Sequence, residues 1–353
     1  MSTPLSPQQS PLPEDSNRAV VQVEEAAMST GTGSIAISAP VAEAGAGAYS
    51  PLAGRLTDLW RLFTGNPKAL TGLCIVLFFV LVAIVGPFFV HHDPNAFSSD
   101  TLVPPSAQHL LGTTQTGQDV LAQLLVGTRV SIFWGFLTGL VVMVLVVVIG
   151  LTSGYFGGII DDALSLLINI FLVLPGLPLA IVLAAFIHSY KGPVTVALVI
   201  AVTSWAYGAR TLRAQTLSMR TRDFVDAARA SGESTWRIIF FEIFPNEISI
   251  VAASFIGAVI YVILAAAGLE FLGLGDSTTV DWGTMLYWAQ NNDALLLGAW
   301  WWFVPPGLCI AVLGAGLTLI NFGMDEVANP RLRREPKLKV IKEKIMSVRK
   351  AVA

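Results

Sequence analysis

Long apolar runs are the feature that most constrains this chain. Most of them reach the roughly 20 apolar residues that an α-helix needs to cross a hydrocarbon core about 30 Å thick. Of its 353 residues, 54% are hydrophobic and only 13% are charged, a balance that ordinary soluble domains do not show. We therefore predict an all-α integral membrane protein with about six transmembrane helices, spanning about residues 70–90, 132–153, 161–187, 193–209, 248–268 and 299–321.

Two of these runs contain prolines. Pro175 and Pro178 lie in the third run, and Pro305 and Pro306 lie in the sixth. Proline removes a backbone donor and clashes with the preceding turn, which breaks a helix in water. In a membrane the neighbouring helices can satisfy the freed carbonyl groups. We therefore expect kinks at these four residues, and kinks that only help packing are as good an interpretation as a gating hinge.

The positions of the basic residues predict the orientation of the chain. Lys and Arg accumulate in the cytoplasmic segments of membrane proteins. With the N-terminus inside, all 21 basic residues except Arg129 and Lys191 fall before the first run, in the loop after the fourth run or after the sixth run. An even number of spans fits this distribution. The prediction is a multi-pass protein of the cytoplasmic (inner) membrane with both termini cytoplasmic.

The two ends of the chain differ from the apolar middle. Residues 1–54 are rich in Ser, Pro, Ala and Gly, and we expect them to form a disordered cytoplasmic tail. Residues 331–353 are basic, which is typical of a solvated tail on the cytoplasmic side, next to anionic lipid. The transmembrane domain is therefore expected over residues 55–330.

One cytoplasmic loop, residues 210–246, is too long to be a simple connector. Connections between packed helices usually take about 2–8 residues, and longer ordered loops are commonly functional. Strong helix formers over residues 223–230 predict a short helix. Gly232 permits a sharp change of direction after it. Ser234 is expected to cap a second helix, and Pro245 to mark the turn into the fifth span.

The residues of this loop resemble a known motif. Asp226-Ala227-Ala228 with Gly232, followed by Ile243-Phe244-Pro245-Asn246, is similar to the EAA loop of binding-protein-dependent ABC importers. In those importers the loop forms a coupling helix that docks into a cleft of the ATPase subunit. The resemblance implies this role for Phe224, Asp226, Ala227, Ala228, Arg229, Gly232 and Pro245.

Further segments resemble the dipeptide/oligopeptide permease family, specifically its C-type subunit. They occur in the expected order: His109-Leu110-Leu111-Gly112-Thr113 with Gly117 and Asp119, Gly157-Gly158 with Asp161, Phe271-Leu272-Gly273-Leu274-Gly275, Trp282-Gly283-Thr284-Met285-Leu286 and Asn329-Pro330-Arg331. The resemblance covers roughly residues 55–335. It implies a transmembrane permease domain with the ABC importer type I architecture.

The resemblance also implies the partners. They are a second homologous permease subunit, two ATPase subunits, an extracytoplasmic substrate-binding protein and membrane lipid, with no nucleic acid. The chain contains no G-x-x-x-x-G-K-[ST] motif, so ATP and Mg are expected on the partner ATPases. We expect no catalytic residue, cofactor or metal site on this chain. The adjacent His91 and His92 lack the geometry of a metal site.

The cargo stays open at this point. Import of peptides is the expected function, and the same machinery importing oligosaccharides or nickel is the alternative. Glu270, where Ser is common in the family, and Asp226, where the motif has Glu, leave coupling intact but leave the substrate uncertain. An ion-driven secondary transporter is less favoured, because such proteins carry ionisable residues inside their spans and the predicted spans contain almost none. A scaffold subunit without a pathway is a third hypothesis.

Overall fold

The structure is a computed structural model that describes residues 66–90, 93–187 and 192–328, with only the backbone for 325–328. These residues belong to one compact unit within Pro51–Ala353. The predicted tails, the pair His91 and His92, Lys191 and the segment Asn329-Pro330-Arg331 lie outside the described residues.

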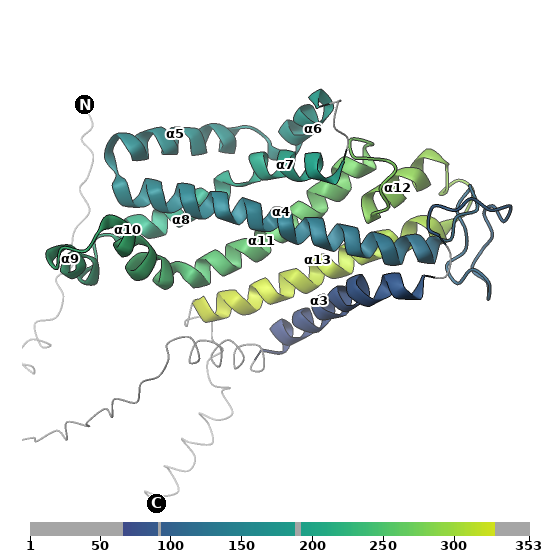
Figure 1. The fold of residues 1–353 in the computed structure, drawn as a ribbon, viewed down its shortest axis with the longest axis horizontal. Coiled ribbons are helices and arrows are strands. Elements are labelled where there is room, and N and C mark those ends of the chain that lie inside the picture. The colour runs from purple at the N-terminus through teal and green to yellow at the C-terminus, as the bar shows by residue number, and fades with distance from the viewer. Residues whose placement is uncertain (1–65, 91–92, 188–191, 329–353) are drawn as a thin grey trace, which may run out of the picture. The chain divides into compact units, whose positions relative to one another are not determined.

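Helices and loops make up the whole of the described part, which contains no strand (Figure 1). The elements are α3 (Pro67–Val85), the 3-10 turn η1 (Gly86–Phe89), α4 (Val120–Phe156), α5 (Gly158–Val173), α6 (Gly176–Phe186), α7 (Pro193–Ser204), α8 (Ala206–Met219), α9 (Asp223–Ala230), α10 (Thr235–Arg237), the π-helix η2 (Ile238–Ile243), α11 (Phe244–Phe271), α12 (Trp282–Asn291) and α13 (Trp300–Ala328). The predicted all-α fold is confirmed.

Four helical segments of the described residues are long and apolar enough to cross a membrane, judged by length and composition. They cover Pro67–Phe89, Val120–Phe156, Thr235–Phe271 and Trp300–Met324. Two further candidates are pairs of helices joined at a sharp bend, α5 with α6 at 89° and α7 with α8 at 42°. The chain is therefore a multi-pass membrane protein with four spans, or up to six if each bent pair is one span.

The second span begins earlier than the sequence predicted. α4 starts at Val120 and not near residue 132. Asp119 causes this start, because its side chain accepts a hydrogen bond from the backbone N–H of Ala122 at 2.9 Å and so caps the helix. Arg129, which was placed in an outer loop, consequently lies inside α4.

The third run is two helices and not one kinked helix. Pro175 stands at the N-cap of α6, and Pro178 lies in the first turn of that helix. A residue that precedes proline is pushed out of the α region, which ends α5 and leaves Leu174 extended. The fourth run likewise continues beyond its predicted end at residue 209, through α8 to Met219.

The last two spans also extend beyond their predicted bounds. The fifth starts at Thr235 and runs to Phe271 without a gap. The sixth, α13, continues through Pro305 and Pro306 as one helix, so a bend at these two residues stays a prediction.

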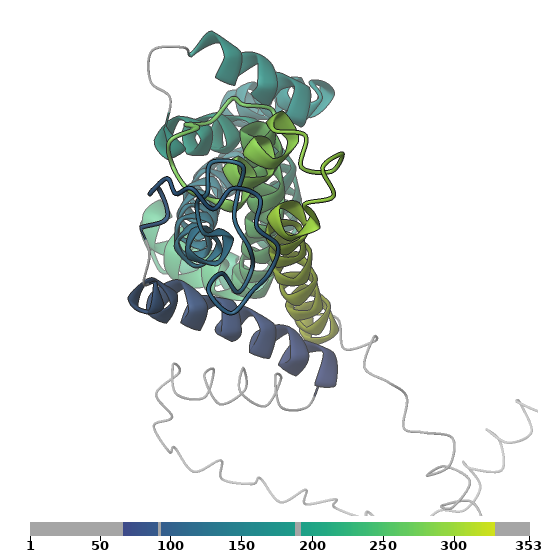
Figure 2. The ribbon, with the colours of Figure 1, turned by 90° about the vertical axis from the view of Figure 1, so that its right-hand side faces the viewer.

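α4 is the central helix of the bundle. It contacts α3, α5, α7, α8 and α11. Figures 1 and 2 show α3 on the opposite side of α4 from α5, with α13 alongside α3. Close contact between α4 and α8 requires a glycine, because a Cβ on Gly154 would lie 2.6 Å from the Cβ of Thr216. α11 contributes to two hydrophobic clusters, one with α4, α7 and α8 and the other with α3 and α13.

Candidate functional site

Five of the seven predicted coupling residues lie on α9, at the end of the bundle opposite to the loop that precedes α4 (Figure 1); Gly232 and Pro245 follow it in the chain. Val225 is fully buried and belongs to the same hydrophobic cluster as Ile238 and Ile239. The side chain of Asp226, in contrast, is 64% exposed. Phe224, Ala227 and Arg229 are exposed as well, and Ala228 is half-buried. The buried side chain of Val225 thus anchors α9, and the opposite face of this helix is exposed.

Gly232 ends α9 through backbone hydrogen bonds. Its N–H bonds to the carbonyl of Arg229 at 3.0 Å, and the N–H of Glu233 bonds to the carbonyl of Ala228 at 3.2 Å. These two bonds define a Schellman motif, which needs a residue with positive φ after the C-cap. Gly232 has φ +78°, and no atom lies within 4 Å of the position of a Cβ there. Glycine is therefore required for its backbone conformation and not for space.

The segment after Gly232 differs from the prediction in two ways. Ser234 occupies the N-cap position of α10, but its side chain makes no capping hydrogen bond. Pro245, which is half-buried, does not mark a turn, because the helix runs through it into α11. The π-helix before it explains this continuity. The N–H of Phe244 bonds to the carbonyl of Ile239, five residues back, and Pro245 then needs no donor at the start of α11.

The supposed loop over residues 210–246 is consequently almost entirely helical. Arg210 and Arg213 lie in α8, and only residues 220–222 join α8 to α9. Arg220 in this connection donates from Nη1 to the carbonyls of Gly154 and Tyr155, both at 3.3 Å. A cation at a helix C-terminus is favourable and satisfies carbonyls that lack helical partners. α9 is thus joined to the end of α4 as well as to α8.

A second contact connects α9 to the same end of α4. The guanidinium carbon of Arg229 lies 5.5 Å from the ring centroid of Tyr155. Arg229 also pairs with Asp226 at 2.9 Å, one turn away on α9. Exposed pairs of this kind contribute little to stability. Their effect here is to hold the Arg229 side chain over α4.

An ion pair fixes the base of this site. Arg213 of α8 meets Asp161 of α5 in a bidentate contact, with Nε to Oδ1 at 2.6 Å and Nη2 to Oδ2 at 2.8 Å. The hydroxyls of Ser153 and Ser165 both donate to Asp161 Oδ1. The side chains are 27% and 14% exposed, for Arg213 and Asp161 respectively. The pair therefore holds α4, α5 and α8 together, at the end of α4 that Arg220 and Arg229 contact.

Glu247 provides a further link between α8 and α11. Glu247 is fully buried, and its Oε2 accepts a hydrogen bond from the hydroxyl of Thr216 at 3.1 Å. Its Oε1 is buried without a hydrogen-bond partner among the described residues. Together with Asp161 and Arg213, this residue shows that the spans contain more ionisable groups than the sequence analysis expected.

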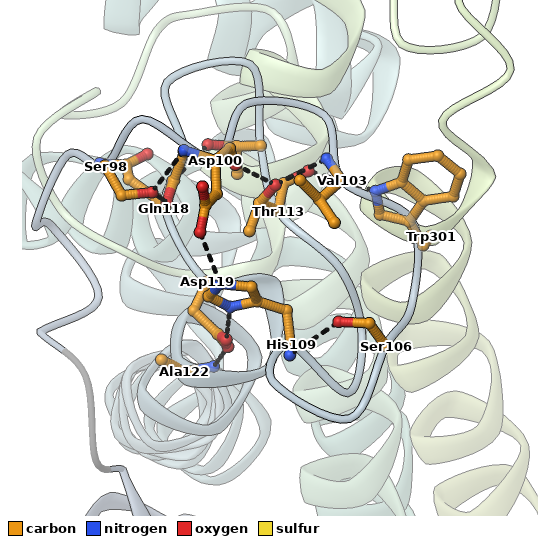
Figure 3. Close-up of polar contacts among 12 residues, drawn as sticks. Ser98, Asp100, Val103, Ser106, His109, Thr113, Gln118, Asp119, Ala122 and Trp301 are labelled. Carbon is orange, nitrogen blue, oxygen red and sulfur yellow. Dashed lines mark hydrogen bonds and ion pairs between the residues drawn. The ribbon is translucent and has the colours of Figure 1, made fainter.

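The loop that precedes α4 is held by a polar network at the other end of the bundle (Figure 3). Nδ1 of His109 lies 2.8 Å from Oδ2 of Asp119, the residue that caps α4. The hydroxyl of Thr113 accepts from the N–H of Val103 at 2.8 Å, and the carbonyl of Thr113 accepts from the indole N–H of Trp301 at 3.2 Å. The predicted motif around His109 therefore forms one ordered loop, attached to the start of α13.

Two carboxyl groups meet on this same side of the molecule. Asp281 is the N-cap of α12 and forms a capping box with Thr284. Its side chain is hydrogen-bonded to that of Glu270, at the end of α11. Two carboxyl groups bond in this way only when one of them carries a proton. Burial raises the pKa of Asp281 above its ordinary value of 3.8.

Comparison with known proteins identifies the family. The family described as "Binding-protein-dependent transport system inner membrane component" matches residues 146–334, a range that contains all the predicted coupling residues. The chain belongs to this family. A second family, "N-terminal TM domain of oligopeptide transport permease C", matches residues 54–105. The resemblance found in the sequence is confirmed.

Three relatives show how far the likeness extends. The chain is 33% identical over 282 residues to the dipeptide transport system permease protein DppC of Bacillus subtilis, covering 78% of this chain and 86% of the relative. It is 32% identical to DppC of Haemophilus influenzae, covering 79% and 96%. It is 30% identical to the oligopeptide transport system permease protein OppC of Bacillus subtilis, covering 83% and 96%.

The ion pair between Asp161 and Arg213 was not predicted from the sequence. Asp161 was noted only as part of a motif, and Arg213 only as one of many cytoplasmic charges. The available signal was weak, because Asp161 stands beside Asp162 at the edge of one apolar run and Arg213 follows Arg210 just after another. Acids and bases near the ends of spans commonly pair with each other inside a membrane protein. The helices of Asp161 and Arg213 are far apart in the sequence, so the pairing itself needed the structure.

The ion pair yields a first prediction. Arg213→Leu leaves the half-buried Asp161 without its charged partner, which costs about 1.5–3 kcal/mol of stability. Asp161→Leu has a similar effect, whereas the double variant leaves no unpaired charge and regains most of the loss. Thermal unfolding of the purified complex measures these changes, with Arg229→Leu as the control for an exposed pair. A double variant whose loss equals the sum of the two single losses would contradict this account.

The carboxyl pair yields a second prediction. Because burial raises the pKa of Asp281, the folded state binds a proton more tightly than the unfolded state. This contribution is complete below the unfolded pKa and is lost as the pH rises through the folded pKa. In Glu270→Gln the amide donates to Asp281 without a proton. The contact between the two side chains then no longer requires the proton that two carboxyl groups must share. The unfolding temperature should therefore fall less in this variant than in the wild type as the pH rises above the ordinary pKa of a carboxyl group. Equal slopes would refute the pairing.

Proposed function

We propose that this chain is a transmembrane permease subunit of an ATP-binding cassette importer for peptides. It couples ATP hydrolysis on partner subunits to translocation of the substrate across the cytoplasmic membrane. Its family and the names of its relatives, dipeptide and oligopeptide transport permeases, support this function. Import of oligosaccharides or nickel by the same machinery is the alternative, and family membership argues against an ion-driven secondary transporter.

The structure of α9 carries the proposal. The helix lies outside the spans, has one buried anchor, Val225, and exposes its other face. Short connections join it to α8 on one side and to the fifth span on the other. Contacts from Arg220 and Arg229 attach it to α4. A displacement of α9 by a partner would thus reach three packed helices at once, and such contiguous contacts are what couples distant sites.

The proposed assembly supplies what this chain lacks. Two ATPase subunits bind ATP and Mg and push α9, and a second homologous permease completes the pathway. An extracytoplasmic binding protein delivers the cargo at the opposite end, near the loop around His109. Phe224, Asp226, Ala227, Ala228, Arg229, Gly232 and Pro245 form or flank the coupling helix. Both termini lie in the cytoplasm, and lipid surrounds the spans.

Gly232→Val tests the proposal. A non-glycine residue at positive φ costs about 1–2 kcal/mol, and valine is especially unfavourable there. The Schellman turn should therefore shift, and peptide uptake by the reconstituted importer should fall at least about fivefold while the complex still assembles.

Gly298→Val is the matched control. Gly298 also has positive φ, +70°, and no atom within 4 Å of a Cβ position, but it lies in the turn before α13. Uptake should stay near the wild-type rate in this control. Wild-type uptake by the Gly232 variant, or an equal loss in both variants, would count against a coupling role for α9.

A further inference from the structure

A cavity of about 630 Å³ lies in the middle of the spans. Val142 and Val146 of α4 line one side of it, and residues from Ile250 to Tyr261 of α11 line another. The remaining lining comes from the two bent pairs, around Gly176 and around Ser204, and from Asn321 of α13. The volume of this cavity is in the range of small-molecule binding sites. Its walls also include interrupted helices, which are typical of cargo sites in transporters.

The break between α5 and α6 frees backbone hydrogen-bonding groups at this cavity. Pro175 has no N–H, so the carbonyl of Phe171, which lines the cavity, lacks its helical donor. The N–H of Gly176 is at the first position of α6, where no intrahelical acceptor exists. Both a free acceptor and a free donor of the main chain therefore belong to the cavity wall. In lipid such groups need polar partners.

Hydroxyl groups surround the same break. Thr203 donates to the carbonyl of Val199 at 3.0 Å, and Ser204 donates to the carbonyl of Ile200 at 2.7 Å. Because their protons are used within α7, both oxygens remain available as acceptors. The hydroxyl of Tyr261 lies against Gly176, where a Cβ would be 3.0 Å from it. Ser254, Tyr207 and Thr211 add further hydroxyl groups to the lining.

The described lining contains no charged side chain. The wall consists of apolar surface with neutral donors and acceptors, which suits neutral polar groups. An amide of a peptide main chain has one donor and one acceptor, the same pair that the break between α5 and α6 offers.

We propose that this cavity binds the main-chain amides of the peptide cargo during translocation, whatever the cargo's side chains. The proposal rests on the proposed function and adds the cargo-contacting residues to it. The backbone at Phe171 and Gly176 and the hydroxyls of Ser254 and Tyr261 exchange hydrogen bonds with the cargo. The apolar walls accommodate the side chains of the cargo without recognising which side chains they are.

Uptake of a peptide and its N-methylated analogue tests this proposal. The complete importer is reconstituted in vesicles and supplied with saturating binding protein loaded with tri-alanine, or with tri-alanine methylated at the middle amide. In the wild type the methylated peptide should be translocated about two- to tenfold more slowly, the effect of one lost hydrogen bond. Tyr261→Phe and Ser254→Ala should slow tri-alanine and reduce this ratio toward one.

Thr71→Val is the matched control, since Thr71 lies on α3, none of whose described residues lines the cavity, and bonds to its own helix. It should keep the wild-type ratio. An unchanged ratio in both cavity variants, with uptake intact, overturns the cavity proposal and leaves the importer function standing. Absence of ATP-dependent uptake of either peptide by the wild-type complex overturns the proposed function instead.

Discussion

Backbone N–H and C=O groups inside a bilayer need hydrogen-bond partners within the protein, and this constraint shapes every element of the chain. It explains why the described residues form helices and loops without strands. It also means that each interruption of a helix has an identifiable cause. Pro175 separates α5 from α6, and the π-helix before Pro245 lets the fifth span continue through a residue that lacks a donor.

The constraint extends to charges, which are arranged at the ends of the bundle. At one end, Asp161 and Arg213 satisfy each other and join α4, α5 and α8. At the other end, Asp119 caps α4 and bonds to His109. The predicted coupling helix, α9, is attached at the first of these ends, so the ion pair lies near the element that the proposed partner would move. The cavity lies between them, in the part of the bundle without charged lining.

Several features followed from the sequence because a local cause produced them. The lengths of the apolar runs predicted the all-α membrane fold, and helix formers next to Gly232 predicted α9 and its end. Features that depend on tertiary contacts did not follow. The pairing of Asp161 with Arg213 joins helices that are far apart in the sequence. The continuous helix through Pro245 depends on a π-helix, which the apolar residues of this segment do not predict. The start of α4 at Val120 could not be predicted from the sequence pattern, because Asp119 lies in a polar stretch that is typical of a loop.

The most direct test of the central claim is photo-crosslinking from α9. A photoreactive amino acid in place of Phe224 in the assembled importer should form an adduct with an ATPase subunit, in a yield that changes with the bound nucleotide. The same amino acid in place of Phe97, which is 76% exposed in the loop before α4, should give no such adduct. An assembled complex in which position 224 reaches no ATPase subunit in any nucleotide state would contradict the account.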